Sequence, residues 1–384
     1  PKHVAAACGL CLCPAVRTRQ RDVSQHRPDG HRNGGRAGLS LPSPQRGTEG
    51  GDMTPMLELE GVSRRFEKTF DAVEKLAFRL GADLRETCVN AVDTASFAVG
   101  RGEVVGLVGE SGCGKSTLGR MVAGLLPVSD GTIRFEGVDV TDARNRQARE
   151  KRLRIQMIFQ DPMSSLNPRM KVQNIIGEAA IYHGLTSRAD MPAYVAGMMA
   201  KVGLDPSYAQ RYPHQFSGGQ RQRIGIARAL AVQPDFLICD ESIAALDVSI
   251  QAQVINLFQD LRRDLDLTYL FISHDLGVIE HIADRVVVMY LGRIVEIAPT
   301  DALFRGPRHP YTQALLDQVP RLGAGRQAFR TVKGEIPSPL NPPPGCHFNP
   351  RCPMAGPRCR AEVPRTITVD GHSTACHLHD GGTA

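Results

Sequence analysis

The chain has 384 residues and a mass of 41.8 kDa, enough for roughly one large domain or two to three smaller ones. Its 42% hydrophobic and 22% charged residues are ordinary for a globular protein, which excludes collagen-like, wholly disordered and disulfide-scaffold classes. The formal charge is +6, Trp is absent and aromatic residues make up 5%, so we expect no stacking platform for single-stranded nucleic acid and predict no nucleic-acid partner.

Residues 1–52 differ in composition from the rest of the chain. Gly, Arg, Ser and Pro dominate, eight basic side chains stand against four acidic ones, and apolar periodicity is missing. Such a segment cannot bury enough apolar surface to offset the entropy of folding, so we predict a disordered extension. No apolar run in the chain approaches the roughly 18 residues of a membrane-spanning helix, which predicts a soluble or peripheral protein.

From residue 53 to about 304, short apolar runs alternate with longer amphipathic segments. The clearest strand-sized runs are residues 103–109, 154–160, 236–240, 268–274 and 285–292. This alternation predicts an α/β domain in which crossover helices join parallel strands. Between 161 and about 230 the apolar spacing is helical, which predicts a helical subdomain.

After residue 304 the pattern changes. A helix is predicted around residues 311–319, and a Pro-rich stretch with four cysteines follows it. We predict a small C-terminal domain over residues 305–384.

A phosphate-binding loop is predicted where the first buried run ends. Residues 109–116 read Gly-Glu-Ser-Gly-Cys-Gly-Lys-Ser, which matches G-x-x-x-x-G-K-[ST] between a strand and a helix. Glycines let the backbone N–H groups and the helix N-terminus face phosphate oxygens. Lys115 is expected to reach the β- and γ-phosphates of a bound nucleotide, and Ser116 is expected to ligate Mg²⁺.

Two carboxylates follow the run at residues 236–240. Asp240 closes this apolar strand, and one carboxylate at such a strand end is what a Mg²⁺ site next to the loop requires. Glu241 is then placed to accept a proton from a water that attacks the γ-phosphate, or to orient that water.

A second anion-binding sequence lies at Ser217-Gly218-Gly219-Gln220, before a predicted helix. The loop at 109–116 already holds the phosphates, so one chain cannot easily use both sequences on one nucleotide. If two chains pair head to tail, Ser217 and Gly219 of each can cap the γ-phosphate held by Lys115 of the other.

Taken together, these motifs resemble the ATP-binding subunit of an ABC transporter, a P-loop NTPase. The resemblance implies ATP and Mg²⁺ as ligands. It assigns catalytic roles to Lys115, Gln160, Glu241 and His274 and magnesium contacts to Ser116, Gln160 and Asp240. Phe66 resembles the aromatic residue that stacks on adenine, with Phe70 or a core role as alternatives. The nucleotide-binding residues that the resemblance implies are Phe66, Gly109, Ser111, Gly112, Gly114, Lys115, Ser116, Thr117, Gln160, Ser217, Gly218, Gly219, Gln220, Asp240 and Asp247.

Over about residues 57–379 the sequence is more specifically similar to the dipeptide, oligopeptide and nickel importers. The segments that carry this similarity are 160–170, 211–230, 245–257, 307–316 and 337–353. The resemblance implies a peripheral subunit on the cytoplasmic face of the cell membrane. It also implies a second, often non-identical, ATPase subunit, two transmembrane permease subunits and an extracytoplasmic solute-binding protein. We therefore expect an ATPase that powers uptake of di- or oligopeptides.

Three alternatives remain open at this point. They are an importer of nickel or another small solute, an ABC ATPase outside transport, and a non-hydrolysing subunit. The chain also departs from the family at Ser242-Ile243-Ala244, where Pro and a hydroxyl residue are usual. Because Lys115 and Glu241 are kept, hydrolysis by this subunit is still expected.

The C-terminal cysteines suggest a metal centre. Cys346, Cys352, Cys359 and Cys376 are four potential thiolate ligands in a chain without a credible export signal. Four thiolates suit an iron–sulfur cluster or Zn²⁺, and free thiols are the third possibility. The family resemblance implies a [4Fe–4S] cluster in some members.

Overall fold

The computed structural model describes residues 55–68, 87–142, 144–161, 165–244, 246–318 and 334–380. The predicted extension at 1–52 and the alternative aromatic residue Phe70 lie outside these ranges.

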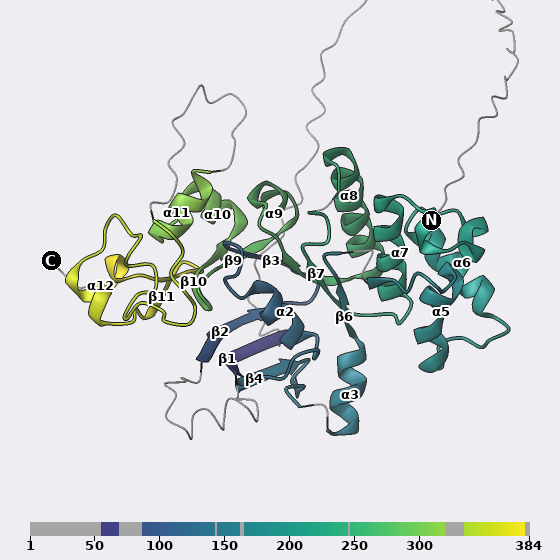
Figure 1. The fold of residues 1–384 in the computed structure, drawn as a ribbon, viewed down its shortest axis with the longest axis horizontal. Coiled ribbons are helices and arrows are strands. Elements are labelled where there is room, and N and C mark those ends of the chain that lie inside the picture. The colour runs from purple at the N-terminus through teal and green to yellow at the C-terminus, as the bar shows by residue number, and fades with distance from the viewer. Residues whose placement is uncertain are drawn as a thin grey trace, which may run out of the picture. The chain divides into compact units, whose positions relative to one another are not determined.

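The main sheet has eight strands in the order β11-β12-β10-β9-β3-β8-β7-β6 (Figure 1). Its five parallel strands are β3 (Val104–Val108), β6 (Ile155–Ile158), β7 (Phe236–Asp240), β8 (Thr268–Ile272) and β9 (Arg285–Tyr290). Every residue of β3, β7 and β8 is buried, as expected for parallel strands covered on both faces. The strands predicted from apolar runs are thus confirmed, and their carboxyl ends share one edge, where α/β sheets bind ligands.

A second, antiparallel sheet covers one side of the first, and the apolar runs did not predict it. Its strands are β1 (Leu57–Lys68), β2 (Thr87–Val99), β4 (Asp130–Phe135) and β5 (Val138–Asp139), in the order β2-β1-β4-β5. Alternate residues of the parallel strands, such as Leu107 and Ile238, share one apolar core with this sheet and with α2 (Lys115–Val122). Figure 1 shows α2 between β2 and the parallel strands.

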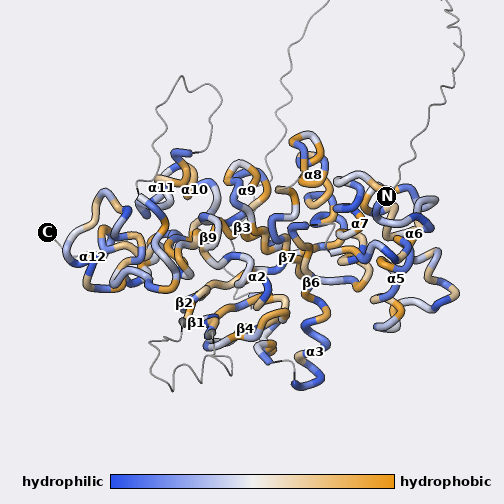
Figure 2. The backbone as a smooth tube through the Cα atoms, in the orientation of Figure 1, coloured by the Kyte–Doolittle hydropathy of each residue, from blue (hydrophilic) through white to orange (hydrophobic). Residues whose placement is uncertain are grey.

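Most of the remaining helices cover the opposite face; α3 (Arg146–Leu153) does not, because its buried Ala148 belongs to the core shared with the antiparallel sheet. Between β6 and β7 the described residues form helices and no strand, which agrees with the predicted helical spacing. Val108 and Cys239 belong to the apolar core on this side. Figure 2 shows hydrophobic residues gathered along β3 and β7. The helices are α3 (Arg146–Leu153), α5 (Val172–Tyr182), α6 (Met191–Lys201), α7 (Gly218–Leu230), α8 (Val248–Leu265), α9 (Leu276–Ile282), α10 (Thr300–Arg305), α11 (Pro310–Leu316) and α12 (Pro357–Ala361), with 3₁₀ turns η1 (Pro206–Gln210), η2 (Pro213–Gln215) and η3 (His377–His379).

The segment after residue 304 shares its sheet and its core with the rest of the chain. The hairpin β11 (Thr366–Val369) and β12 (His372–Ala375) pairs with β10 (Arg293–Pro299), which in turn pairs with β9. Phe348 is buried against Tyr290 and Tyr311, with ring centroids 5.3 and 5.4 Å away. Within the described ranges, no helix combines the length and apolarity that crossing a membrane requires.

Candidate functional site

The turn after β3 is shaped by glycines that no other residue could replace. Gly109 has φ +152°, and a Cβ there would lie 2.1 Å from the carbonyl oxygen of Met289. Gly114 has φ +109°, and its Cβ would lie 2.2 Å from the carbonyl oxygen of Ala91. Gly112 also has a positive φ, yet it is exposed with open space around it. The base of the loop is therefore packed tightly while its top stays accessible to a ligand.

Lys115 lies at the centre of this loop. It is the first residue of α2 and is only 4% exposed. Its Nζ donates hydrogen bonds to the carbonyl oxygens of Gly109, at 2.7 Å, and Glu110, at 3.0 Å. A positive charge and a helix N-terminus thus meet at one point, which favours a bound anion.

Ser116 and Asp240 meet although they are distant in sequence. The Ser116 hydroxyl donates to Oδ1 of Asp240 at 2.7 Å, which joins the start of α2 to the end of β7. Burial raises the pKa of Asp240, and the hydrogen bond from Ser116 opposes that rise. Two oxygen atoms at this distance suit Mg²⁺, which prefers oxygen ligands. The residues present fit the predicted magnesium site.

Glu241 joins two other predicted residues. The Gln160 side-chain amide donates to its Oε2 at 2.7 Å, and Nδ1 of His274 lies 3.4 Å from its Oε1. These residues follow β7, β6 and β8, so neighbouring parallel strands bring them together. Glu241 has φ +45°, and its N–H donates to the carbonyl oxygen of Ile272. This backbone conformation is rare outside glycine and is typical of functional sites.

The residues predicted at the start of α7 face outward. Ser217 caps the helix, because its hydroxyl accepts from the N–H of Gln220 while the Gln220 side chain accepts from the N–H of Ser217. Ser217 and Gly218 are exposed. Among the described residues, none of the hydrogen bonds joins Ser217–Gln220 to the loop at 109–116. The structure therefore brings the second anion-binding sequence to the surface, not to the loop of its own chain.

Close packing explains why Gly219 is a glycine in the sequence Ser217–Gln220. A Cβ on Gly219 would lie 2.6 Å from Cγ2 of Ile250 on α8, so the start of α7 rests against that helix. The predicted Asp247 is the exposed N-cap residue of α8, and its side chain makes no capping hydrogen bond. Ser242, where the sequence departs from the family pattern, is buried, and its hydroxyl has no hydrogen-bond partner of standard geometry among the described residues.

Phe66 lies on β1 and is available to a ligand. It pairs with Val89 of β2, is 39% exposed, and lies under the Arg64 guanidinium at 4.7 Å from the ring centroid. Ala91 lies two residues after Val89 on β2, and its carbonyl oxygen leaves no room for a Cβ on Gly114 of the phosphate loop. The position is compatible with a base-stacking role.

The four C-terminal cysteines line one pocket, together with Phe348. Burial raises the pKa of Cys346, and that of Cys376 to about 11, so both thiols are protonated at neutral pH. No group of three or more His, Cys, Asp or Glu side chains in the described part of the chain forms a metal-binding arrangement. The geometry of these thiols as they stand therefore does not fit a metal centre, and the predicted cluster gains no support from it.

Glu110 in the phosphate loop has partners that the sequence motifs did not predict. Its carboxylate pairs with Arg351, and its N–H donates to the hydroxyl of Tyr311. No local pattern could have shown this, because more than 200 residues separate the partners.

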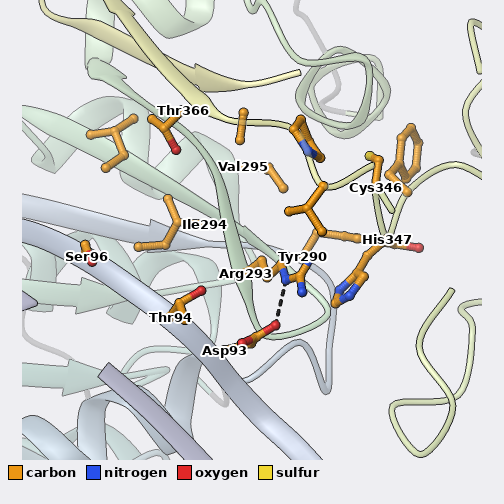
Figure 3. Close-up of a pocket in the computed structure, with 15 residues that line it drawn as sticks. Asp93, Thr94, Ser96, Tyr290, Arg293, Ile294, Val295, Cys346, His347 and Thr366 are labelled. Atoms are coloured by element: carbon orange, nitrogen blue, oxygen red, sulfur yellow. Dashed lines mark hydrogen bonds and ion pairs between the residues drawn. The ribbon is translucent and has the colours of Figure 1, made fainter. Parts of the chain in front are cut away.

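A separate cavity of about 310 Å³ lies between β2, β10 and the loop around His347 (Figure 3). The ion pair between Asp93 and Arg293, at 2.6 Å, closes one side of it. Of the predicted site residues, only Cys346 lines this cavity. Its charged groups are already paired, and the catalytic arrangement lies elsewhere.

Comparison with known proteins identifies the family. Residues 92–244 match the model described as ABC transporter, and residues 295–359 match the one described as oligopeptide/dipeptide transporter, C-terminal region. The oligopeptide transport ATP-binding protein AppF of Bacillus subtilis is 50% identical over 296 residues, which cover 76% of this chain and 90% of AppF. The chain belongs to the ABC transporter ATP-binding subunits.

Other relatives agree with this membership. The oligopeptide transport ATP-binding protein OppF of Salmonella typhimurium is 49% identical over 292 residues, covering 75% of this ABC subunit and 87% of OppF. A putative peptide import ATP-binding protein of Brucella ovis is 47% identical over 325 residues, covering 84% and 98% of the two chains.

Solved structures show the same fold. The ATP-binding cassette MJ0796, in a dimeric post-hydrolysis state with ADP and Pi, aligns with a TM-score of 0.55 at 22% identity, covering 64% of this chain and 99% of that one. The cbiO1 protein of Clostridium perfringens aligns with a TM-score of 0.52 at 23% identity, covering 65% and 91%. These structures show that the ABC subunit has the P-loop NTPase fold. The family match and the relative AppF make it an ATPase of the ABC class.

Proposed function

We propose that this ABC subunit hydrolyses ATP in a site completed by a second ATPase subunit, and that the cycle powers uptake of di- or oligopeptides across the cell membrane. The observation that carries the proposal is the meeting of Lys115, Ser116–Asp240 and Gln160–Glu241–His274 at one edge of the parallel sheet. These groups supply phosphate binding, cation binding and proton transfer.

Phosphate binding falls to the loop and α2. The exposed top of the loop, at Ser111 and Gly112, presents backbone to the phosphates, and Lys115 reaches them by exchanging its carbonyl partners for phosphate oxygens. Ser116 and Asp240 would hold Mg²⁺, with the Gln160 side-chain oxygen as a third ligand. The cation, when bound, neutralises charge on the β- and γ-phosphates.

Glu241 would act as the base. Its carboxylate accepts from Gln160 and faces His274, so it is held on two sides at the carboxyl end of β7. A water aligned with the γ-phosphate would lose its proton to this carboxylate. His274, whose side chain is 57% exposed, would contact the γ-phosphate and report its presence.

The second subunit follows from the position of Ser217–Gln220. They lie at a helix N-terminus, with Ser217 and Gly218 exposed and Gly219 and Gln220 half-buried, and among the described residues they have no phosphate-binding partner in their own chain. A second ATPase subunit placed head to tail would receive Ser217 and Gly219 against the γ-phosphate at its own loop. Each nucleotide would then be clasped by both chains.

Peptide uptake is supported by the relatives. AppF and OppF are named as oligopeptide transport proteins and the Brucella ovis relative as a putative peptide import protein. The family model that matches residues 295–359 is described as the C-terminal region of an oligopeptide/dipeptide transporter. We propose that two permease subunits and an extracytoplasmic solute-binding protein complete the importer. This subunit would sit peripherally on the cytoplasmic face and pass its motion on through residues 161–170, of which 162–164 lie outside the described ranges.

The function is tested with the assembled transporter in vesicles. Uptake of a labelled oligopeptide should require ATP and should be lost in the Lys115→Ala variant. Uptake of peptide that persists in this variant would contradict the proposal. ATP turnover stimulated by nickel and not by peptide would favour the alternative cargo.

The chain divides into two proposed parts, and its four C-terminal cysteines are candidate metal ligands. We propose an ATPase part over residues 53–304, with helices at 161–230, and a C-terminal part over 305–384. An iron–sulfur cluster at the four cysteines rests on the family resemblance alone, because the thiols share a pocket but, within the described residues, form no metal-binding arrangement. Iron, sulfide and zinc analysis of anaerobically purified protein decides among a cluster, Zn²⁺ and free thiols. Metal content unchanged by Cys359→Ser would remove that residue from the ligands.

A further inference from the structure

Glu110 is the one acidic residue inside the phosphate loop, and the C-terminal segment holds its side chain. Two guanidinium nitrogens of Arg351 donate to its two carboxylate oxygens, at 2.6 and 2.9 Å. The Arg351 side chain is 5% exposed and that of Glu110 is 20% exposed. A bidentate pair with this burial has well-defined geometry and is shielded from salt.

The backbone of Glu110 is held as well. Its N–H donates to the hydroxyl of Tyr311 at 2.8 Å, and its carbonyl oxygen accepts from Lys115. Because Tyr311 occupies this N–H, the phosphates are left to the N–H groups further along the loop. The C-terminal segment thus contacts the loop at its side chain and at its backbone.

The residues that hold Glu110 rest on a rigid base. The Tyr290 hydroxyl lies 3.4 Å from Arg351, and the rings of Tyr290, Tyr311 and Phe348 pack against one another. Tyr311 and Phe348 are buried almost completely. This base fixes where the guanidinium and the hydroxyl stand.

Charge gives the pair a consequence for nucleotide binding. A free carboxylate at position 110 would repel a triphosphate held a few residues along the same loop, and it would compete for Lys115. The hydrogen bonds to Glu110 also hold the pKa of Arg351 above its usual value, so the guanidinium beside this carboxylate stays charged.

We propose that Arg351 and Tyr311 are positioning residues for ATP binding, which act through Glu110 by neutralising its carboxylate and fixing its N–H. The inference rests on the proposed nucleotide site. It assigns to the C-terminal segment a part in holding the phosphate loop of its own chain.

The test exploits the sign of the charge. With mant-ATP as the fluorescent probe and the full chain, Arg351→Met should weaken binding about tenfold, because the carboxylate is left unpaired. Glu110→Gln should bind mant-ATP at least as tightly as the original chain, because a positive charge is left near the phosphates. The double variant should return to within about threefold of the original affinity. A loss of structure alone would weaken binding in both single variants.

A matched control lies at the other end of β3. Arg285 and Glu103 form a similar bidentate pair, at 2.8 and 3.1 Å, and Glu103 lies immediately before β3, at the strand end away from the loop. Arg285→Met removes a bidentate ion pair whose arginine side chain is 28% exposed, against 5% for Arg351, and should leave mant-ATP affinity within about twofold. In the assembled transporter, Arg351→Met should raise the KM for ATP and leave kcat within about twofold.

Tyr311→Phe keeps the test decisive if Arg351→Met does not fold. It removes only the hydroxyl that accepts from Glu110, and it should weaken mant-ATP binding about threefold. The inference is overturned if Tyr311→Phe and Arg351→Met bind as the original chain does, or if Glu110→Gln weakens binding as much as Arg351→Met. An original chain that bound no mant-ATP would overturn the nucleotide site itself, and the inference with it.

Discussion

The phosphate loop and the start of α7 are both glycine-containing helix N-termini, yet they differ in how their polar groups are satisfied. At the loop, Lys115 donates to carbonyl oxygens of the loop itself, whereas Ser116 and Glu110 bind groups from distant parts of the chain. At α7, the side chains of Ser217 and Gln220 cap each other's backbone N–H groups, and Ser217 faces solvent. The first site is organised by its own chain, whereas the second has an exposed face with no such partner among the described residues. This difference leads us to a nucleotide site shared by two subunits.

The largest expected effect is on hydrolysis at the organised site. Glu241→Gln keeps the hydrogen-bonding shape but cannot take a proton, so ATP turnover by the assembled transporter should fall about 1000-fold while ATP stays bound. Steady-state phosphate release and nucleotide retention measure the two quantities. The control Glu280→Gln changes an exposed acid on α9 and should leave turnover unchanged. Undiminished hydrolysis by Glu241→Gln would remove its assigned role.

Nucleotide affinity should depend on Lys115 almost as strongly. Lys115→Ala removes a buried cation that would bind phosphate oxygens, and ATP affinity should fall about thirtyfold or more. Lys151, which pairs with Glu136 at the surface, offers a control of the same chemistry, and Lys151→Ala should bind ATP normally. Equal affinity of Lys115→Ala and the original chain would count against the loop assignment.

At the exposed start of α7, a substitution should lower turnover in the assembled transporter without changing the ATP affinity of the isolated chain. Ser217→Arg should leave ATP affinity of the isolated chain within about twofold, yet lower turnover in the assembled transporter about 100-fold, because the bulky cation blocks the facing subunit. Ser217→Ala removes the cap and should cost about 1 kcal/mol of stability, whereas Ser217→Asn keeps the cap. Thermal unfolding separates the two effects. Weaker ATP binding by the isolated Ser217→Arg chain would break the contrast between the sites.

The smallest effect concerns thiol chemistry within the loop. Burial raises the pKa of Cys113, which is 4% exposed, so its thiol stays protonated and shielded. Alkylation at pH 8 followed by mass spectrometry should modify the exposed Cys88 first and leave Cys113 intact while the chain is folded. Equally fast modification of both residues would show that the loop opens in solution.

The sequence predicted the structural features that a short segment determines by itself, which are the buried strands and the phosphate loop. The all-apolar runs of β3, β7 and β8 indicate strands buried on both faces, and glycine spacing predicts the loop before α2. Gln160 and His274 were assigned from the family resemblance, and the structure places both beside Glu241 because all three follow neighbouring parallel strands.

Long-range pairing escaped prediction because periodicity carries no information about partners. The hairpin β11–β12 joins the main sheet through β10. Its strands have four residues each, which is too short to give a recognisable strand pattern in the sequence. The pair of Glu110 and Arg351 joins two motifs that looked independent. The cysteine spacing suggested a metal centre, but spacing does not determine whether thiols converge as ligands, and within the described residues no such convergence is found.

The most direct test of the shared site is the association of two ATPase subunits, measured by light scattering with the Glu241→Gln chain, alone and mixed with its partner ATPase subunit. We predict a two-subunit complex that forms only with ATP and Mg²⁺ and that Ser217→Arg prevents while nucleotide remains bound. Nucleotide-loaded chains that stay single, or that associate equally well with Ser217→Arg, would contradict the account.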